Sequence, residues 1–454
     1  MKCTWIIISI QFIIISYLFI NSQTQTEVPN LNKSLEKLRH SACNSALLSS
    51  SCLTFNKPDT RNCNIAFTFA AMIDIRLRFT DFTNLLIPPP EARHHEQVKT
   101  KQQMLETMAY SFSTGRAAEY RVTKELFDFI ISILQGVENW KTLGGNGAMM
   151  SLRAAHEGCG SYLSAPVTEE MTKYFPSNVQ FLNEFVDAPD LHIILEYREG
   201  ERWGKYLAPR SNRFYMNHDT LNINPKFLEG INSTPNVQVI AIGGLQLIEN
   251  TEVEDDFLTK THIAILSNKN KKIKTHIEMG DFHSYTYFKK LQPLFKSADS
   301  IGMNEQELGI LLTHLKKIKF AGYPSKAPIK KYLEDLVDLI DELTDNLYEA
   351  SRIHLHTINS QIICSNNEWT DPEIATARSA ILAGQFACNN TDIQHTSFSF
   401  YENDDWYVED ITKCWGHKHM RCCLALVPTC LNVVQVSGLG DNISAMGLVY
   451  HPIK

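Results

Sequence analysis

The stretch VSGLGDNISAMG, residues 436–447, carries the pattern from which the fold of this chain is inferred. Gly438 and Gly440 lack a Cβ, so a tight turn here can direct several backbone N–H groups at one phosphoryl oxygen. The small residues after Asp441 predict a helix whose N-terminus points at the same place. Because a carboxylate repels a phosphate, we interpret Asp441 as a base that removes a proton from an acceptor hydroxyl. The alternative is an ordinary glycine turn in which Asp441 caps the next helix.

Length and composition favour one large domain, with room for a smaller appendage. The chain has 454 residues, 44% hydrophobic and 20% charged, which suffices for one large domain with a substantial core. The formal net charge of −7 argues against a partner such as nucleic acid or an anionic membrane, since both require a basic surface. We therefore expect a small-molecule substrate.

The N-terminus has the pattern of a targeting segment. A positive start is followed by an apolar run over residues 4–20 and by polar residues 21–26, which predicts a signal peptide over 1–22, with an uncleaved anchor as the alternative. Residues 23–62 are interpreted as an N-terminal arm and 63–454 as the main domain. We expect the domain to be soluble in the secretory pathway, in the endoplasmic reticulum lumen or secreted, with no membrane contact beyond the signal segment.

Ten cysteines remain after Cys3, and an even number in a secretory chain is consistent with disulfides whose pairing cannot be deduced from spacing. No zinc-type pair of Cys-x-x-Cys units occurs. Glycosylation sequons lie at Asn32, Asn232, Asn389 and Asn442. The last lies inside the glycine turn, so we expect it to be buried against a nucleotide and unmodified.

Carboxylates follow several predicted strands. Residues 64–74 form a mostly apolar run that predicts one buried strand of a parallel sheet, ending at Asp74. A second strand ends at Glu278, and Glu307 lies in the first turn of a helix that follows another strand. Open α/β sheets bind ligands at the carboxyl ends of their strands, so two acids there predict a Mg²⁺ site contacted mostly through water. The alternative for Glu307 is a partner of the helix dipole.

Polar groups suited to a sugar lie elsewhere in the chain. Gly144-Gly145-Asn146 predicts a strand-to-helix turn whose N–H groups and amide can bond adjacent hydroxyls without carrying charge. Residues 191–197 and 206–216 predict strands. Glu119 precedes an apolar stretch, 120–134, and taken alone predicts a first-turn helix residue.

The C-terminal part adds further elements. Residues 352–357 predict a strand with His354 and His356 on one side, but no third ligand follows, so no metal is assigned to them. Residues 373–388 predict a surface helix and 421–427 a late strand.

Four motifs occur in the order of one known family. Gly144-Gly145-Asn146, His276-Ile277-Glu278, Asn304-Glu305-Gln306-Glu307 and Gly438-Leu439-Gly440-Asp441 resemble those of the ADP-dependent glucokinases, animal type, over about residues 64–450. The resemblance implies a ribokinase-like α/β fold: a large domain with a central, mostly parallel sheet and a small β-rich lid. The segments that would build the lid are approximately 75–130 and 187–220.

The resemblance also implies an activity and a site. The reaction would transfer a phosphoryl group from ADP to the 6-hydroxyl of D-glucose with Mg²⁺, giving glucose 6-phosphate and AMP, in a monomer that binds glucose and ADP. Asp441 would be the base, and Glu278, Glu307 and Asp441 would place the metal. The sugar would contact Asp74, Glu119, Gly144, Gly145, Asn146 and His192, and the nucleotide phosphates would contact Asn304, Gly438 and Gly440.

The chain departs from the family pattern at three positions. Thr68 and Ala70 stand where the family has a Gly and an Asn, and Gln435 stands where animal members have a basic residue. A lost amide would weaken sugar binding by on the order of 1 kcal/mol. Two other functions therefore stay open: a secreted sugar- or nucleotide-binding protein without catalysis, and an ATP-dependent sugar or nucleoside kinase of the same fold.

Overall fold

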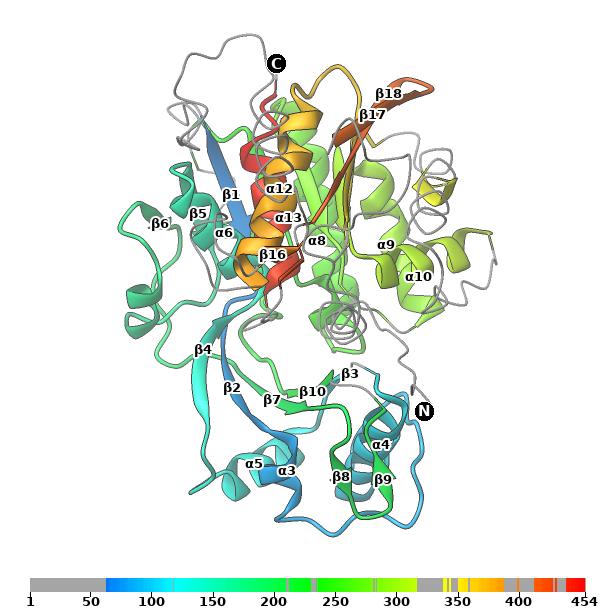
Figure 1. The fold of residues 1–454 in the computed structure, drawn as a ribbon. Coiled ribbons are helices and arrows are strands. Elements are labelled where there is room, and N and C mark those ends of the chain that lie inside the picture. The colour runs from blue at the N-terminus through cyan, green and yellow to red at the C-terminus, as the bar shows by residue number, and fades with distance from the viewer. Residues whose placement is uncertain are drawn as a thin grey trace, which may run out of the picture.

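Two β-sheets, one large and one small, form the framework of the molecule (Figure 1). The computed structural model describes residues 63–116, 118–209, 212–229, 234, 236–280, 282, 284–316, 338–340, 343, 350–357, 360–387, 398–399, 412–427, 429–430 and 438–453. Among these residues, no helix is both long and apolar enough to cross a bilayer.

The large sheet has ten strands in the order β17-β18-β15-β14-β13-β12-β11-β1-β5-β6. Strands from β14 to β6 run parallel to one another, whereas β15, β18 and β17 continue the sheet antiparallel. The strands are β1 (Asn64–Thr68), β5 (Gly160–Ser164), β6 (Val179–Phe181), β11 (Val239–Ile242), β12 (Lys274–Glu278), β13 (Ser300–Met303), β14 (Arg352–His356), β15 (Ser360–Ser365), β17 (Thr412–His417) and β18 (Met420–Leu426).

Helices cover both faces of this sheet and form two separate apolar cores. One face carries α6 (Asn146–His156), α12 (Pro372–Ala387) and α13 (Leu439–Val449), which pack against one another. The other carries α8 (Glu254–Asn270), α9 (Tyr285–Ser297) and α10 (Glu305–Lys316) (Figure 1). Strands of a parallel sheet covered on both faces are buried on both sides, and β11 and β13 are buried along their whole length.

The small sheet has five strands in the order β3-β10-β7-β2-β4 and forms the lower part of the molecule in Figure 1. Its strands are β2 (Met72–Arg78), β3 (Ala118–Arg121), β4 (Trp140–Gly144), β7 (Leu191–Tyr197) and β10 (Asn212–Asn217). The helices α3 (Phe79–Thr83), α4 (Lys101–Thr114) and α5 (Lys124–Ile133) and the hairpin β8–β9 (Arg202–Trp203, Tyr206–Leu207) pack on it around a third core. β4 lies outside the two segments that the sequence assigned to this part.

The prediction of one strand over residues 64–74 was wrong. The chain leaves the large sheet after Thr68 and enters the small sheet at Met72, so Asp74 lies inside β2 rather than at the end of a core strand. The break occurs where Ala70 adopts a left-handed conformation with φ 58°, which no regular strand can include. An apolar run cannot reveal such a crossing, because both sheets bury it equally well.

Two further predictions were also wrong. Glu119 lies in the short strand β3, and the helix after it begins only at Lys124, where Thr123 provides the N-cap. The helix predicted at the surface over 373–388 is instead α12, whose small residues are buried between α13 and β18. Alanine-rich helices pack closely enough to serve as core elements, although their composition looks surface-like.

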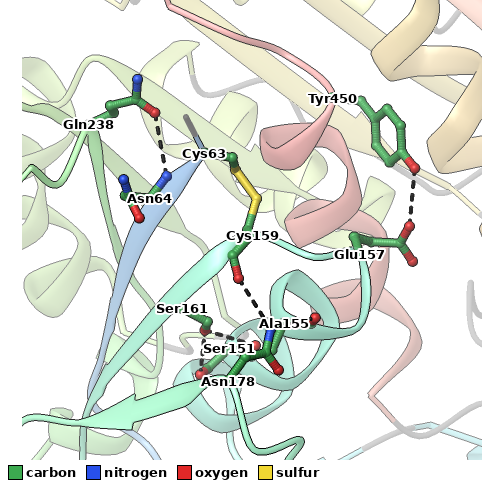
Figure 2. Close-up of a disulfide and its surroundings, with 10 residues drawn as sticks. All are labelled: Cys63, Asn64, Ser151, Ala155, Glu157, Cys159, Ser161, Asn178, Gln238 and Tyr450. Atoms are coloured by element: carbon green, nitrogen blue, oxygen red, sulfur yellow. Dashed lines mark hydrogen bonds between the residues drawn. A yellow bond between two sulfur atoms is a disulfide. The ribbon is translucent and has the colours of Figure 1, made fainter. Parts of the chain in front are cut away.

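Three disulfides join described residues. Cys63–Cys159 ties the start of β1 to the residue before β5 (Figure 2). Cys364–Cys422 and Cys414–Cys423 link directly paired positions, so they fasten β15, β18 and β17 to one another. The expectation of disulfides therefore holds for six cysteines, whereas Cys43, Cys52, Cys388 and the side chain of Cys430 lie outside the described part of the chain.

Candidate active site

A cavity of about 250 Å³ lies between the two sheets. The sequence placed twelve residues in a site, and every one of them lines this cavity. The small sheet provides Asp74, Glu119, Gly144 and His192; the large domain provides Asn146, Glu278, Asn304, Glu307, Gly438, Gly440 and Asp441; Gly145 lies at the crossing between them. We call the first wall the lid face and the second the floor.

Asp441 lies in the first turn of α13, directly after the glycine turn. Gly438 is the N-cap residue and has φ 73°, a conformation that favours glycine. Asn146 Nδ2 donates a hydrogen bond to Asp441 Oδ1 over 2.6 Å, and Gln246 Nε2 in turn donates to Asn146 Oδ1 over 3.2 Å. Burial raises the pKa of Asp441 to about 7, and the charge of Glu278 acts in the same direction.

Glu278, at the end of β12, experiences the opposite effect. Burial alone would raise its pKa, but the charge of His356 and hydrogen bonds from His276 and His356 hold the pKa well below its usual range. His356 Nε2 lies 2.7 Å from Glu278 Oε1, and His276 Nε2 lies 3.2 Å from Oε2, to which Ser444 also donates. Glu278 is therefore an ionised carboxylate in a fixed position.

Glu307 and Asn304 bond each other at the start of α10. The Asn304 backbone N–H and side-chain amide donate to the two Glu307 oxygens, each over 2.8 Å, and the Glu307 N–H donates back to Asn304 Oδ1 over 2.9 Å. This reciprocal arrangement is a capping box, which holds the carboxylate at the cavity wall.

Within the described residues, no cluster of three or more His, Cys, Asp or Glu side chains is poised to bind a metal directly. Glu278, Glu307 and Asp441 nevertheless line one cavity as hard oxygen acceptors. That donor set fits Mg²⁺, which usually keeps several of its waters and contacts protein carboxylates through few direct bonds.

Asp74 lies on the lid face, pressed against the glycine turn. A Cβ added to Gly144 would come within 2.3 Å of Asp74 Oδ1, so glycine is required for this approach. At the next residue, Gly145 has φ 97°, and an added Cβ would lie 2.2 Å from the Ala70 carbonyl oxygen. Burial raises the pKa of Asp74 to about 6, although the nearby His192 opposes this shift.

His192 lies beside Asp74 in the register of β7 and β2. Its Nε2 lies 3.0 Å and 3.1 Å from the two oxygens of Asp219, and its Nδ1 lies 3.9 Å from Glu119 Oε1. Burial disfavours its charged form, but the charge of and hydrogen bond to Asp219 prevail and raise the pKa of His192 to about 10. The lid face thus presents an imidazolium between carboxylates.

Sequence reasoning missed five residues that belong to this arrangement: Arg76, Arg213, Asp219, Gln246 and His356. Arg213 lines the cavity, and its Nε lacks a hydrogen-bond partner within the described part of the chain. The signal that could have revealed Arg76 is period-two spacing, since it follows Asp74 on the same face of β2. His356 stood out in the sequence, but only the pairing of β12 with β13 and β14 shows that it meets Glu278.

Asn442 is buried, as expected, but its partners differ from those predicted. Its side chain accepts from Arg153 Nε over 2.9 Å and donates to the Gly438 carbonyl over 2.7 Å. It therefore faces α6 and the turn rather than the cavity, because position 442 lies a third of a turn around α13 from Asp441. The sequons at Asn32, Asn232 and Asn389 and the departure at Gln435 lie outside the described residues.

Comparison with solved structures shows the fold. The chain superimposes on an ADP-dependent kinase in complex with fructose-6-phosphate and ADPbetaS with a TM-score of 0.68, at 16% identity, covering 93% of this chain and 96% of that one. A hypothetical ADP-dependent phosphofructokinase from Pyrococcus horikoshii OT3 gives 0.61 at 17% identity, covering 86% and 98%. The expected ribokinase-like α/β class, with its mostly parallel sheet and small β-rich sheet, is confirmed.

Comparison of sequences identifies the family. The ADP-dependent glucokinase of Bos taurus is 25% identical over 430 residues, 87% of this chain and 86% of that protein. The probable ADP-dependent glucokinase of Caenorhabditis elegans is 25% identical over 433 residues, 86% and 84%. The model of the ADP-specific phosphofructokinase/glucokinase conserved region matches residues 63–450. With its motifs gathered around one cavity in the matching fold, this chain belongs to the ADP-specific phosphofructokinase/glucokinase family.

Proposed function

We propose that this chain is an ADP-dependent glucokinase, which transfers the terminal phosphoryl group of ADP to the 6-hydroxyl of D-glucose and yields glucose 6-phosphate and AMP. One observation carries the proposal: a carboxylate with a pKa of about 7, Asp441, lies in the same cavity as the acceptors and donors of the lid face. A general base works best when its pKa lies near the working pH. A protein that only bound sugar would not need such a group.

The lid face and the glycine turn would hold the sugar. Asp74, Glu119 and the Asn146 amide offer acceptors and donors for hydroxyl groups, and the Gly144-Gly145 turn leaves room for a close approach. The fixed pair of His192 and Asp219 supports this wall from behind. Such a set suits an uncharged polyhydroxyl ligand, whose hydroxyls both donate and accept.

The floor would carry the phosphoryl transfer. The first backbone N–H groups of α13, at the Gly438–Gly440 turn, lack helical acceptors and favour negative charge on the moving phosphoryl group. Asp441 would accept the proton of the 6-hydroxyl as the new O–P bond forms and the bond to AMP breaks. Arg213 of the lid face would counter the charge that remains on the phosphoryl oxygens.

Magnesium would be held by Glu278 and Glu307, mostly through water, with Asp441 nearby. When bound, Mg²⁺ neutralises charge on the donor phosphates and orients them. Glu278 is suited to this role because its pKa lies well below the usual range, so it keeps its charge at any physiological pH.

The test is glucose 6-phosphate formation by the purified chain with Mg²⁺, with ADP or ATP as donor and glucose or fructose 6-phosphate as acceptor. We expect turnover with ADP and glucose, and a fall in kcat of about 10³-fold in Asp441→Asn, because general-base catalysis contributes roughly that much. Turnover with ATP alone would indicate the ATP-dependent kinase. If the folded protein binds glucose or ADP but shows no turnover with either donor, it is a sugar- or nucleotide-binding protein without catalysis.

We further propose that the chain works as a monomer in the secretory pathway, in the endoplasmic reticulum lumen or secreted, and that it is a glycoprotein. The three disulfides support an oxidising compartment, because such bonds persist there and are rare in the cytosol. The burial of Asn442 supports its remaining unmodified. Mass spectrometry of the protein purified from its native source, before and after removal of N-glycans, would detect carbohydrate and identify the modified asparagines.

A further inference from the structure

A row of polar side chains crosses four neighbouring strands of the large sheet behind the cavity. In the register of the sheet, Ser365 of β15 pairs with Arg352 of β14, Arg352 with Ser300 of β13, and Ser300 with His276 of β12. All four are buried, and the Arg352 side chain has no exposed surface. Glu278 is two residues beyond His276 and hence on the same face of the sheet. The row therefore reaches the cavity at Glu278.

One arm of the row leads from Arg352 to Glu278. Arg352 Nη1 donates to Ser300 Oγ over 2.9 Å, and Ser300 Oγ lies 2.8 Å from His276 Nδ1. His276 Nε2 then lies 3.2 Å from Glu278 Oε2. Arg352 itself does not line the cavity, and its hydrogen-bonded route to the carboxylate runs through these two side chains.

A second arm leads from Arg352 in the opposite direction. Arg352 Nε donates to His451 Nδ1 over 2.9 Å, and His451 Nε2 lies 3.2 Å from Ser365 Oγ. This arm ends on β15, and neither His451 nor Ser365 is among the residues that line the cavity. The two arms share one guanidinium and have the same chemistry, but only one ends at a functional carboxylate.

The direction of the first arm is determined by the chemistry of arginine. A guanidinium can only donate hydrogen bonds, so Ser300 must accept from Arg352. Among the described residues, the only partner of Ser300 Oγ that can accept its proton is His276 Nδ1, so this buried hydroxyl is satisfied as a donor only when Nδ1 is unprotonated. In a neutral imidazole the remaining proton sits on Nε2 and points at Glu278 Oε2.

We propose that Arg352 is a positioning residue that sets the tautomer of His276 through Ser300 and thereby fixes the carboxylate of Glu278. The opposite tautomer would direct the Nε2 lone pair at the carboxylate, and the two would repel each other. The inference rests on the proposed function in one respect: the fixed carboxylate is the one that would hold Mg²⁺. Partners that orient metal-contacting side chains from behind typically change metal affinity by about 10–100-fold when they are removed.

The tautomer can be measured without metal, nucleotide or turnover. The full chain is labelled with ¹⁵N in its histidine rings, and the His276 signals are assigned from their loss in His276→Gln. We expect an unprotonated Nδ1 and a protonated Nε2 in the wild type, and a loss of this preference in Ser300→Ala. A wild-type His276 protonated on Nδ1 overturns the proposal, whatever reaction the protein catalyses.

The consequence for the metal is measured separately, as Mn²⁺ affinity by electron paramagnetic resonance. Ser300→Ala should weaken Mn²⁺ binding about ten-fold, as should Arg352→Lys if it folds. Ser365→Ala is the matched control, because it removes a buried serine hydroxyl from the other arm, and its Mn²⁺ affinity should equal that of the wild type. Equal weakening in Ser300→Ala and Ser365→Ala would mean that the row acts only on stability and would overturn the positioning role.

Discussion

The floor and the lid face both present buried carboxylates to one cavity, but their charged groups have different surroundings. On the floor, Asp441 and Glu278 have pKa values shifted in opposite directions, because only Glu278 is surrounded by histidines. On the lid face, His192 carries a charge that Asp219 balances, and Arg76 pairs with Glu196. Groups shifted apart are suited to exchanging protons, whereas balanced charges are suited to holding a ligand.

The two walls also differ in how the backbone supports them. The floor is built from strand ends and helix starts of a sheet that is covered on both faces. The lid face is the open surface of a five-stranded sheet that is covered only on its other side. A wall of the first kind keeps its side chains in place, and a wall of the second kind is suited to closing over a substrate.

The largest effect is expected at the crossing between the walls. Gly145→Ala would place a Cβ 2.2 Å from the Ala70 carbonyl oxygen, at a residue with φ 97°, so we expect the free energy of unfolding to fall by about 3 kcal/mol or more. Gly144→Ala is the matched comparison, since the atoms nearest to its Cβ would belong to the side-chain carboxylate of Asp74 rather than to backbone. Denaturant unfolding should show a small loss there, together with a higher KM for glucose. An equal loss of unfolding free energy in Gly145→Ala and Gly144→Ala would contradict the difference expected between a backbone and a side-chain clash.

The second effect concerns the floor and pH. With the Asp441 pKa raised to about 7, the base is ionised above that pH and protonated below it. At saturating glucose, kcat should therefore fall about ten-fold for each pH unit below 7, or about 100-fold by pH 5. The residual kcat of Asp441→Asn should not show this limb. If kcat of Asp441→Asn still fell below pH 7, the fall would be due to the titration of another group.

The third effect is a gain of stability when the base is removed. A carboxyl whose pKa is raised from 3.8 to about 7 on folding is ionised more easily in the unfolded chain, so its burial costs stability that grows as the pH rises above 3.8 and is complete above about 7. Asp441→Asn should raise the free energy of unfolding by on the order of 2 kcal/mol at pH 8. The gain should shrink as the pH falls through 7 towards 4. Thermal unfolding of the wild type and the variant at pH 8 and at pH 4 measures the gain and its loss. A variant less stable than the wild type at pH 8 would refute the expectation.

The smallest effect concerns the lid face. Asp219→Asn removes the charge that outweighs burial, so the pKa of His192 should fall from about 10 towards neutrality. The KM for glucose should then rise about ten-fold at pH 8 and recover at pH 6, where the ring regains its proton. Asp190→Asn is the control, because the Asp190 carboxylate accepts hydrogen bonds from the Thr220–Asn222 segment, whereas His192 bonds Asp219. It should lower stability without making KM depend on pH.

The ends of the core strands were predictable from the sequence, and the crossing between the sheets was not. Strands β7 and β14 match the predicted ranges 191–197 and 352–357 to within one residue, since alternation or an apolar run bounded by turn residues is a local property. The split of residues 64–74 was missed because only contacts distant in sequence decide which sheet each half joins. For the same reason, the partners of Glu278 and His192, from which their pKa shifts arise, could not be read from the chain.

The sequence by itself determined which residues carry the chemistry, because a glycine turn with a base, strand-end acids and a polar glycine turn are short local patterns. Only the tertiary structure decided the pKa, and hence the role, of each acid among those residues. Asp441 and Glu278 are both acids in strand-end or turn motifs, but packing surrounds one with an amide and the other with two histidines. Burial and charge act through space, so neighbours that are far apart in sequence distinguish the proton acceptor from the fixed carboxylate.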